Sequence, residues 1–187
     1  AGRLLKTIKS EGDRMSRLIG DMLSLANADN KSWSIMKTDC ELDTLLLDTY
    51  EKYQPILHGK KISLKVVLPE EPLSICKCDS ARISQVLGIL LDNGASYVSA
   101  GGRMEMGVKE NEKYFQLYVQ DNGPGIPDEN KEAVFRRFYR ADPARKEKQH
   151  FGLGLCIARE IVTLHKGSIH ILDTPGGGST FVIRLPK

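Results

Sequence analysis

The sequence has no long apolar run, and this absence narrows the possible classes of protein. No segment approaches the ~18 apolar residues that a membrane-spanning helix needs, and no secretory signal opens the chain. Hydrophobic residues make up 41% of the 187 residues, a globular value, and no segment is of low complexity. The sequence therefore predicts one compact domain with an extra element.

Excess charge and cysteine are also scarce. The 27 Lys and Arg residues against 24 Asp and Glu residues give a net charge of +3, which is too small to favour nucleic acid or an anionic membrane as a partner. The four cysteines are Cys40, Cys76, Cys78 and Cys156. A zinc site on Cys76 and Cys78 needs a second pair of ligands at suitable spacing, and the sequence offers none. We expect reduced thiols of a cytosolic protein.

The first part of the chain has the pattern of one long helix. The chain starts with Ala-Gly rather than Met, and the helical pattern is already under way, so we interpret it as a fragment. Residues 3–29 carry a wide apolar stripe that suits a helix bundle, although a helix packed on its own domain is the alternative. The polar residues 27–33 follow as a linker. The apolar residues on the heptad-like seam are Leu4, Ile8, Met15, Leu18, Met22 and Leu25.

The remainder mixes helical and strand patterns. Helical spacing and alternation distinguish the two types of element. The predicted elements in chain order are a helix over 42–56, a strand over 62–68, a helix capped by Asp79 or Ser80, a hairpin over 104–119, a helix from Gly152 and a closing hairpin over 169–185. Interspersed helices and mostly antiparallel strands predict an α+β fold, a two-layer α/β sandwich preceded by one long helix.

The segment DNGPGIP, Asp121 to Pro127, follows a predicted strand. Gly123 and Gly125 permit backbone conformations that a Cβ forbids, so the chain can turn sharply beside a ligand. A buried Asp121 carboxylate only accepts hydrogen bonds, and adenine offers an exocyclic amino donor where guanine offers an oxygen. The segment therefore favours an adenine-reading carboxylate, although by itself it is also a good turn.

Two further patterns point to phosphate and metal. The segment GLGL, Gly152 to Leu155, opens a helix, and bare backbone N–H groups at a helix start bind phosphate. No Gly-Lys-Ser follows, so this is not a Walker loop. Asn93 can present an amide oxygen to Mg²⁺. A surface or capping Asn is the alternative for that residue.

A long basic stretch separates Asp121 from Gly152. It has little apolar periodicity, which is typical of a lid or a disordered stretch. Phe135 and Phe138 are expected to anchor it by burying their rings. Its cations can clamp phosphates or remain solvated. They are Arg136, Arg137, Arg140, Arg145, Lys146 and Lys148.

Together and in this order, these patterns resemble the sensor histidine kinases of two-component systems, in the superfamily of gyrase, chaperone, histidine kinase and MutL ATPases (GHKL). LLDNGASY is similar to the asparagine box, DNGPGIP and FGLGLCIAREIV to the glycine boxes, VFRRFYRAD to the phenylalanine box and GGGST to the last glycine box. EGDRMSRLIGDMLSLANAD resembles the second helix of the dimerisation domain. The resemblance covers nearly the whole chain and implies the Bergerat ATP-binding fold, a mixed sheet packed on helices.

The resemblance also implies a nucleotide site. Asn93 would hold Mg²⁺ on the phosphates, Asp121 would read the adenine amino group, and Thr180 would back the adenine. Tyr139 and Arg140 would reach the nucleotide from the lid. The full implied site consists of Asn93, Tyr97, Asp121, Gly123, Gly125, Ile126, Tyr139, Arg140, Gly152, Leu153, Gly154, Leu155 and Thr180.

At the level of the whole protein, the resemblance implies a kinase with ATP and Mg²⁺ as cofactors. Residues 1–30 would be the second helix of the dimerisation domain, and residues 31–187 the catalytic domain. The phosphoacceptor histidine would lie upstream, so this fragment is expected not to phosphorylate itself. The expected partners are a response regulator and a second copy bound through the dimerisation helices. The chain would be the cytoplasmic portion of a bacterial kinase, anchored in the membrane through upstream segments only.

Several positions depart from the family pattern. Ile89 stands where a second Asn is frequent, Ser96 where Lys or Arg is usual, and Gly94 replaces a usual Ala. His150 and Phe151 replace the commoner Gly and Thr or Ser. Ile89 also occupies the position of the water-activating Glu of related ATPases and cannot take a proton, which disfavours hydrolysis as the main activity. A non-catalytic ATP-sensing module remains an alternative.

Overall fold

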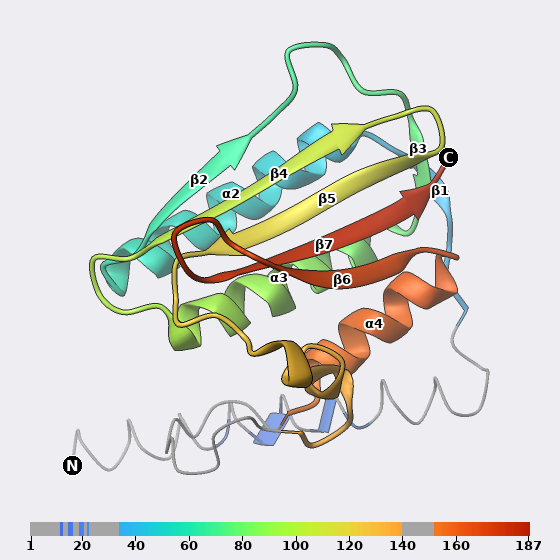
Figure 1. Ribbon diagram of the computed structural model, residues 1–187. Helices are drawn as coiled ribbons and strands as arrows, with labels where there is room; N and C mark the ends of the chain where they lie inside the picture. The colour runs from blue at the N-terminus through green and yellow to red at the C-terminus, as the bar shows by residue number, and fades with distance from the viewer. Residues whose placement is uncertain (1–11, 13–14, 17–18, 21, 23–33, 140–151) are drawn as a thin grey trace.

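A computed structural model describes residues 12, 15–16, 19–20, 22, 34–139 and 152–187. It has two layers, a five-stranded mixed sheet and three helices packed on one face of it (Figure 1). The strands, in their order across the sheet, are β2 (Ser63–Val67), β4 (Arg103–Glu110), β5 (Tyr114–Asp121), β7 (Ser179–Pro186) and β6 (Ser168–Asp173). The helices are α2 (Leu42–Gly59), α3 (Ser80–Tyr97) and α4 (Gly154–Leu164). The predicted sandwich is confirmed.

Strand pairing follows from the hairpins and one crossover. β4 and β5 form a hairpin, as do β6 and β7, and β5 pairs with β7 in the centre of the sheet. These pairs are antiparallel, whereas β2 pairs with β4 in parallel. Alternate residues of β5 are buried, because one face of the sheet packs on the helices. Both predicted hairpins are confirmed.

Helix α3 crosses the middle of the core and leads toward the expected site. Its predicted stripe is buried, with every member 0–1% exposed: Ile83, Val86, Leu87, Leu90 and Leu91. Asp79 caps the helix, because its side chain accepts a hydrogen bond from the Arg82 N–H over 3.1 Å. The cap explains why the helix starts at Ser80, and the apolar spacing explains which of its faces packs into the core.

A small second sheet was not predicted. β1 (Thr38–Cys40) pairs antiparallel with β3 (Cys76–Cys78), and Cys40 lies directly opposite Cys76. Strands of three residues are too short to show an alternating pattern, so sequence periodicity does not reveal them. All four cysteines are buried free thiols.

The basic stretch is better anchored than its composition predicts, as far as the structure describes it. Two short 3-10 helices, Asp128–Asn130 and Ala133–Phe135, follow the DNGPGIP turn. Phe135 is 6% exposed, and its ring meets that of Phe181 edge-on at 6.4 Å between centroids. The expectation for Phe138 is wrong. Its side chain is 62% exposed, because its backbone adopts a φ of +60° and its N–H bonds to the Gly152 carbonyl.

The first predicted helix lies largely outside the described residues. The described positions between Gly12 and Met22 are helical, and their apolar side chains Met15, Ile19 and Met22 are more than half exposed. The seam residues Leu4, Ile8, Leu18 and Leu25 and the linker up to Trp33 are not described. Among the helices that the structure describes, none is long and apolar enough to cross a membrane.

Candidate nucleotide-binding site

Asp121 is the last residue of the central strand β5 and is only 8% exposed. Its Oδ1 atom accepts hydrogen bonds from the Gly123 N–H at 2.8 Å and the Ser179 N–H at 3.3 Å. Its Oδ2 atom makes no hydrogen bond with any described residue. A carboxylate oxygen in this position can accept a hydrogen bond from a ligand donor.

The environment of Asp121 acts on its protonation in two directions. Burial raises the pKa of the carboxyl group above its ordinary value, and the N–H groups of Gly123 and Ser179 oppose this shift. The two donors stabilise the ionised form, which accepts hydrogen bonds on both oxygens. A ligand donor at Oδ2 would act in the same direction as these N–H groups.

The glycines of the DNGPGIP turn and of the GGGST loop contact each other next to Asp121. Gly178 has a φ of +109°, and a Cβ on it would lie 1.9 Å from the Asp121 carbonyl oxygen. Gly125 has a φ of +78°, and its Cβ would lie 3.3 Å from the Gly178 carbonyl oxygen. Only glycine fits this crossing. The fold therefore joins the DNGPGIP turn to the GGGST loop of the β6–β7 hairpin.

The family resemblance predicts Thr180 at this point, whereas the structure brings its neighbour Ser179 to Asp121. Ser179 is 4% exposed and donates its N–H to the carboxylate. Thr180 pairs with Gln120 on the opposite face of the sheet, and its hydroxyl oxygen lies 2.9 Å from that of Thr174. A signal was present in the sequence, since the alternation of Phe181, Ile183 and Leu185 places Ser179 on their core-facing side.

The C-terminal part of helix α3 carries the next group of predicted site residues. Asn93 is half-buried, and its amide makes no hydrogen bond with the residues that the structure describes. Gly94 next to it is buried and packs against Met104 and Asp121. Tyr97 ends the helix and is 40% exposed. Beyond the turn, Ile126 is partly buried against the core. The packing of Gly94 against Asp121 brings the end of α3, which carries Asn93 and Tyr97, to the end of β5.

The start of α4 completes the arrangement. Gly154 is the first residue of α4, two residues later than predicted, and a Cβ on it would lie 3.1 Å from Ile89 of α3. Ile89 is one helical turn before Asn93, so the GLGL segment packs on α3 one turn away from Asn93. Among the described residues, no side chain caps α4. N–H groups at such a helix start can bind an anion.

The other predicted members of the GLGL segment offer a ligand only their backbone. Leu153 is fully buried and Leu155 packs against the core, so their side chains belong to the interior. Gly152 has a φ of +74°, and a Cβ on it would lie 2.7 Å from the Tyr139 carbonyl oxygen. This contact brings the two described ends of the basic stretch together.

Tyr139 and Arg140 are the predicted lid residues. The Tyr139 hydroxyl donates to Asn130 Oδ1 over 2.8 Å, which fixes it toward the 3-10 helices. Arg140 lies outside the described residues, as do His150 and Phe151.

The chemistry of the site fits a Mg²⁺ ion that is held mainly by its nucleotide. No group of three His, Cys, Asp or Glu side chains with metal-site geometry occurs in the described parts of the chain. Asn93 offers one amide oxygen, and Ile89 offers none. Because Mg²⁺ binds through a few protein oxygens together with phosphates and waters, a single amide is sufficient.

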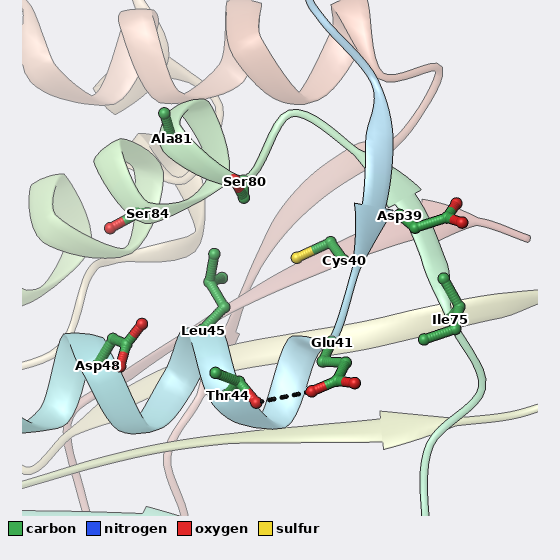
Figure 2. Close-up of a pocket in the computed structure, with 10 residues that line it drawn as sticks. All are labelled: Asp39, Cys40, Glu41, Thr44, Leu45, Asp48, Ile75, Ser80, Ala81 and Ser84. Carbon is green, nitrogen blue, oxygen red and sulfur yellow. Dashed lines mark hydrogen bonds between the residues drawn. The ribbon is translucent and has the colours of Figure 1, made fainter.

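A separate cavity of about 520 Å³ lies at the other end of α3 (Figure 2). Residues of β1, the start of α2 and the start of α3 line it, among them Cys40, Thr44 and Ser84. Ser84 and Asn93 are nine residues apart on α3, a distance of about 14 Å along the helix axis. This cavity therefore lies away from the glycine segments and is not the candidate nucleotide site.

Comparison with known proteins agrees with the geometry. The family described as "Histidine kinase-, DNA gyrase B-, and HSP90-like ATPase" matches residues 78–187, which include the asparagine and glycine segments. The chain belongs to this family. The matched region covers every predicted nucleotide-binding residue.

The proteins that this chain is similar to include a sensor protein and a histidine kinase. Sensor protein SrrB of Staphylococcus aureus strain N315 is 34% identical over 184 residues, which cover 98% of this chain and 31% of SrrB. The catalytic domain of histidine kinase ThkA is 26% identical with a TM-score of 0.72, over 81% of this chain and 96% of that one. This chain contains an ATP-binding catalytic domain of the sensor histidine kinase type.

A similar fold also occurs in a solved complex of a histidine kinase with a response regulator. ThkA in complex with the response regulator protein TrrA has a TM-score of 0.78 at 24% identity, over 98% of this chain and 51% of that one. That similarity shows the fold. The chain spans about 31% of the length of the curated relatives that it matches.

Proposed function

We propose that this domain binds ATP with Mg²⁺ and donates the γ-phosphoryl group to a histidine outside the chain, from which it passes to an aspartate of a response regulator. The single observation that carries the proposal is the Asp121 carboxylate, which is buried and whose Oδ2 atom makes no hydrogen bond with the described residues. Such a carboxylate selects the adenine amino group over the guanine oxygen. The uncapped start of α4 supplies N–H donors for the phosphates.

The other residues of the site have supporting roles in this proposal. Asn93 holds Mg²⁺ on the phosphates, and Tyr97 flanks the nucleotide. Gly123, Gly125 and Ile126 line the base pocket, where Ser179 is a further member. Gly152, Leu153, Gly154 and Leu155 meet the phosphates through their backbone. Tyr139 and Arg140 reach the nucleotide from the basic stretch. Thr180 supports the base only through its backbone, because its side chain lies on the opposite face of the sheet.

When bound, Mg²⁺ neutralises charge on the phosphates. Transfer then depends on bringing an exposed imidazole in line with the terminal phosphate. Ile89 cannot accept a proton, so the domain lacks a water-activating base at that position and favours transfer over hydrolysis. The chain's contribution is to bind and orient the donor.

The proposal includes the surroundings of the domain. Residues 1–30 act as the second helix of a dimerisation domain, residues 31–187 form the catalytic domain, and the complete kinase is a homodimer with a membrane anchor upstream. The exposed side chains of Met15, Ile19 and Met22 support the helix assignment, because an apolar stripe needs a partner. SrrB is a sensor protein, and ThkA is found with a response regulator.

The test is phosphotransfer from γ-labelled ATP with Mg²⁺ to a polypeptide that carries the upstream histidine helix. We expect acid-labile, base-stable label on that polypeptide, and its transfer to a response regulator. The Asp121→Asn variant is the matched control and should lose the labelling. ATP binding without any labelling would favour the second candidate, a non-catalytic ATP-sensing module. The observation in favour of that candidate is that Asn93 is the only predicted metal ligand, since Ile89 cannot coordinate.

A further inference from the structure

Met104 occupies the space that Gly94 leaves open. A Cβ on Gly94 would lie 2.3 Å from the Met104 Cε atom, far inside normal contact distance, and 3.2 Å from its Sδ atom, a tight contact. Met104 is 2% exposed, and Gly94 is buried. The thioether is flexible enough to fill such an irregular gap between a helix and a sheet. The two residues therefore form a complementary pair across the α3–β4 contact.

This pair lies beside the carboxylate of the nucleotide site. In the β4–β5 ladder Met104 is directly opposite Asp121, so their side chains are neighbours on the same face of the sheet. The Cβ position of Gly94 is also 3.7 Å from the Asp121 Cβ atom. Gly94 follows Asn93 in α3. Met104 thus lies between the helix that carries Asn93 and the strand end that carries Asp121.

The hydrogen bonds of Asp121 fix only part of its position. Both donors bind Oδ1, one from the turn at Gly123 and one from the loop at Ser179. The direction of Oδ2 then depends on how the Asp121 side chain packs against its neighbours. On the helix side those neighbours are Gly94 and Met104. Because protein interiors are close-packed, the volume of Met104 sets the separation of α3 and β5 at this point.

We propose that Met104, together with Gly94, is a positioning residue that aims the Asp121 carboxylate at the 6-amino group of an adenine nucleotide. The inference rests on the proposed function and extends it, because it assigns base discrimination to a pair of buried residues that act through the Asp121 carboxylate. Its consequence is that the pair controls the preference for a 6-amino over a 6-oxo purine.

The probe for this preference is the affinity for ATP relative to inosine triphosphate, which has an oxygen in place of the amino group. Both are titrated calorimetrically into the 187-residue chain with Mg²⁺. We expect Met104→Ala to lower the ATP-to-inosine triphosphate affinity ratio by about three- to tenfold, the range of one net hydrogen bond. Phosphate contacts are common to both ligands, so a general loss of binding cancels in this ratio.

Met106→Ala is the matched control. Met106 lies two residues along the same strand, is fully buried on the same face and pairs with Val119 instead of Asp121. Its truncation creates a similar cavity, and we expect it to lower the melting temperature without changing the ratio. An equal fall of the ratio in both variants would mean that the effect is loss of core packing, which would overturn the inference.

A complementary exchange gives the decisive comparison. Gly94→Ala alone forces Met104 to move, so we expect it to lower the ratio. Gly94→Ala combined with Met104→Val moves volume from the strand to the helix and should restore the ratio to within about twofold of the parent, since volume-conserving exchanges are tolerated best. If Met104→Ala does not fold, Met104→Val takes its place.

The outcomes separate this inference from the proposed function. A parent chain that prefers ATP, with an unchanged ratio in folded Met104 variants, overturns the inference alone. A parent chain with no preference for ATP overturns the assignment of Asp121 and this inference with it. A reduced ratio in Met104→Ala, an unchanged one in Met106→Ala and rescue by the double variant support the positioning role.

Discussion

At the scale of single residues, Asp121 is the group whose chemistry is most constrained. It is buried, its Oδ1 atom is held by two backbone N–H groups, and its Oδ2 atom makes no hydrogen bond with the described residues. Burial has raised the pKa of this carboxyl group, so its acceptor function is lost on acidification earlier than that of an ordinary carboxyl group. The exchange of this carboxylate for an amide is therefore informative.

We predict that Asp121→Asn weakens ATP binding about tenfold or more while the fold is retained. The amide can still accept from Gly123 and Ser179 through its oxygen, but its NH₂ group then faces the adenine amino group, donor against donor. A mispaired polar contact of this kind costs ~1–3 kcal/mol. Calorimetric titration with ATP measures the effect, and a melting curve checks the fold. Unchanged affinity in a normally melting variant would remove Asp121 from the site.

Asn93 allows a similar test of the metal. Asn93→Ala should abolish the Mg²⁺-dependent part of the ATP affinity and leave adenosine binding nearly unchanged, because Ile89 cannot replace the lost oxygen ligand. Titrations of ATP and adenosine with and without Mg²⁺ give the comparison. Ser96→Ala on the same helix is the control, since its hydroxyl bonds to the Asp92 carbonyl oxygen at 2.9 Å. If Mg²⁺ strengthens ATP binding to Asn93→Ala as in the parent, the assignment is wrong.

At the scale of elements, His165 connects α4 to α3. Its Nε2 atom accepts from the Asp79 N–H at 3.0 Å, and its Nδ1–H donates to the Ile161 carbonyl oxygen at 2.8 Å. The ring is 2% exposed. Burial lowers the pKa of His165, and the positive charge of Lys37 lowers it further. The hydrogen bond to the Ile161 carbonyl and the negative charge of Asp79 act in the opposite direction. The neutral ring of His165 therefore accepts a hydrogen bond from the N-cap residue of α3.

The sign of the resulting pH dependence follows from this lowered pKa. The unfolded chain binds a proton near the ordinary value of about 6.5, whereas the folded chain resists it. The contribution of His165 to stability is therefore complete above that value and is lost as the pH falls below it toward the folded-state pKa. At neutral pH, His165→Ala should cost about 1–3 kcal/mol, because the Asp79 N–H loses its partner.

Urea unfolding of the parent and of His165→Ala at pH 7.5, 6.5 and 5.5 tests both statements. We expect the difference between the two free energies of unfolding to shrink as the pH falls. A constant difference over this range would mean that His165 does not titrate differently in the folded and unfolded states.

The anchoring of the basic stretch gives a second element-scale prediction. Phe135→Ala should destabilise the chain by about 3–5 kcal/mol, the cost of removing a buried aromatic side chain. Its ring packs on Phe181, and the Arg159 guanidinium lies 5.2 Å from the ring centroid. Phe138→Ala is the natural control, because this exposed side chain should change stability by no more than about 0.5 kcal/mol. Denaturant unfolding would contradict the assignment if the two costs were equal or reversed.

At the scale of the whole molecule, the described histidines are unsuitable as phosphoacceptors. His165 is buried with both ring nitrogens hydrogen-bonded. His58 is exposed in the last turn of α2, and His170 is exposed on β6 with its Nε2 atom 3.0 Å from the Ser168 hydroxyl. None of them has the acidic neighbour and Arg-Thr-Pro-like turn expected after an acceptor. His150 lies outside the described residues.

We therefore predict that the chain binds ATP but acquires no acid-labile, base-stable phosphate on its own. Incubation with Mg²⁺ and γ-labelled ATP, with and without a polypeptide that carries the upstream histidine helix, is the measurement. Label should appear only in the second mixture. Stoichiometric labelling of the isolated chain would disprove this view of the acceptor, and His58→Gln and His170→Gln variants would then locate the modified residue.

The sequence alone determined the parts of the protein that depend on local pattern. The stripe from Ile83 to Leu91 predicted α3, and the alternation from Phe115 to Val119 predicted β5, because side-chain periodicity follows directly from helix and strand geometry. The order of the asparagine and glycine motifs predicted the family, the adenine-reading role of Asp121 and the metal role of Asn93. The family is confirmed by the match over residues 78–187, while the two roles stay predictions.

The tertiary structure alone decided how distant segments fit together. It placed Cys40 opposite Cys76 in the β1–β3 strand pair, buried Phe135 and left Phe138 exposed. It also brought Ser179 rather than Thr180 to Asp121. It also placed Met104 against Gly94. The physical reason is that such contacts depend on strand register, backbone φ and close packing between residues far apart in the chain, and no local period encodes these.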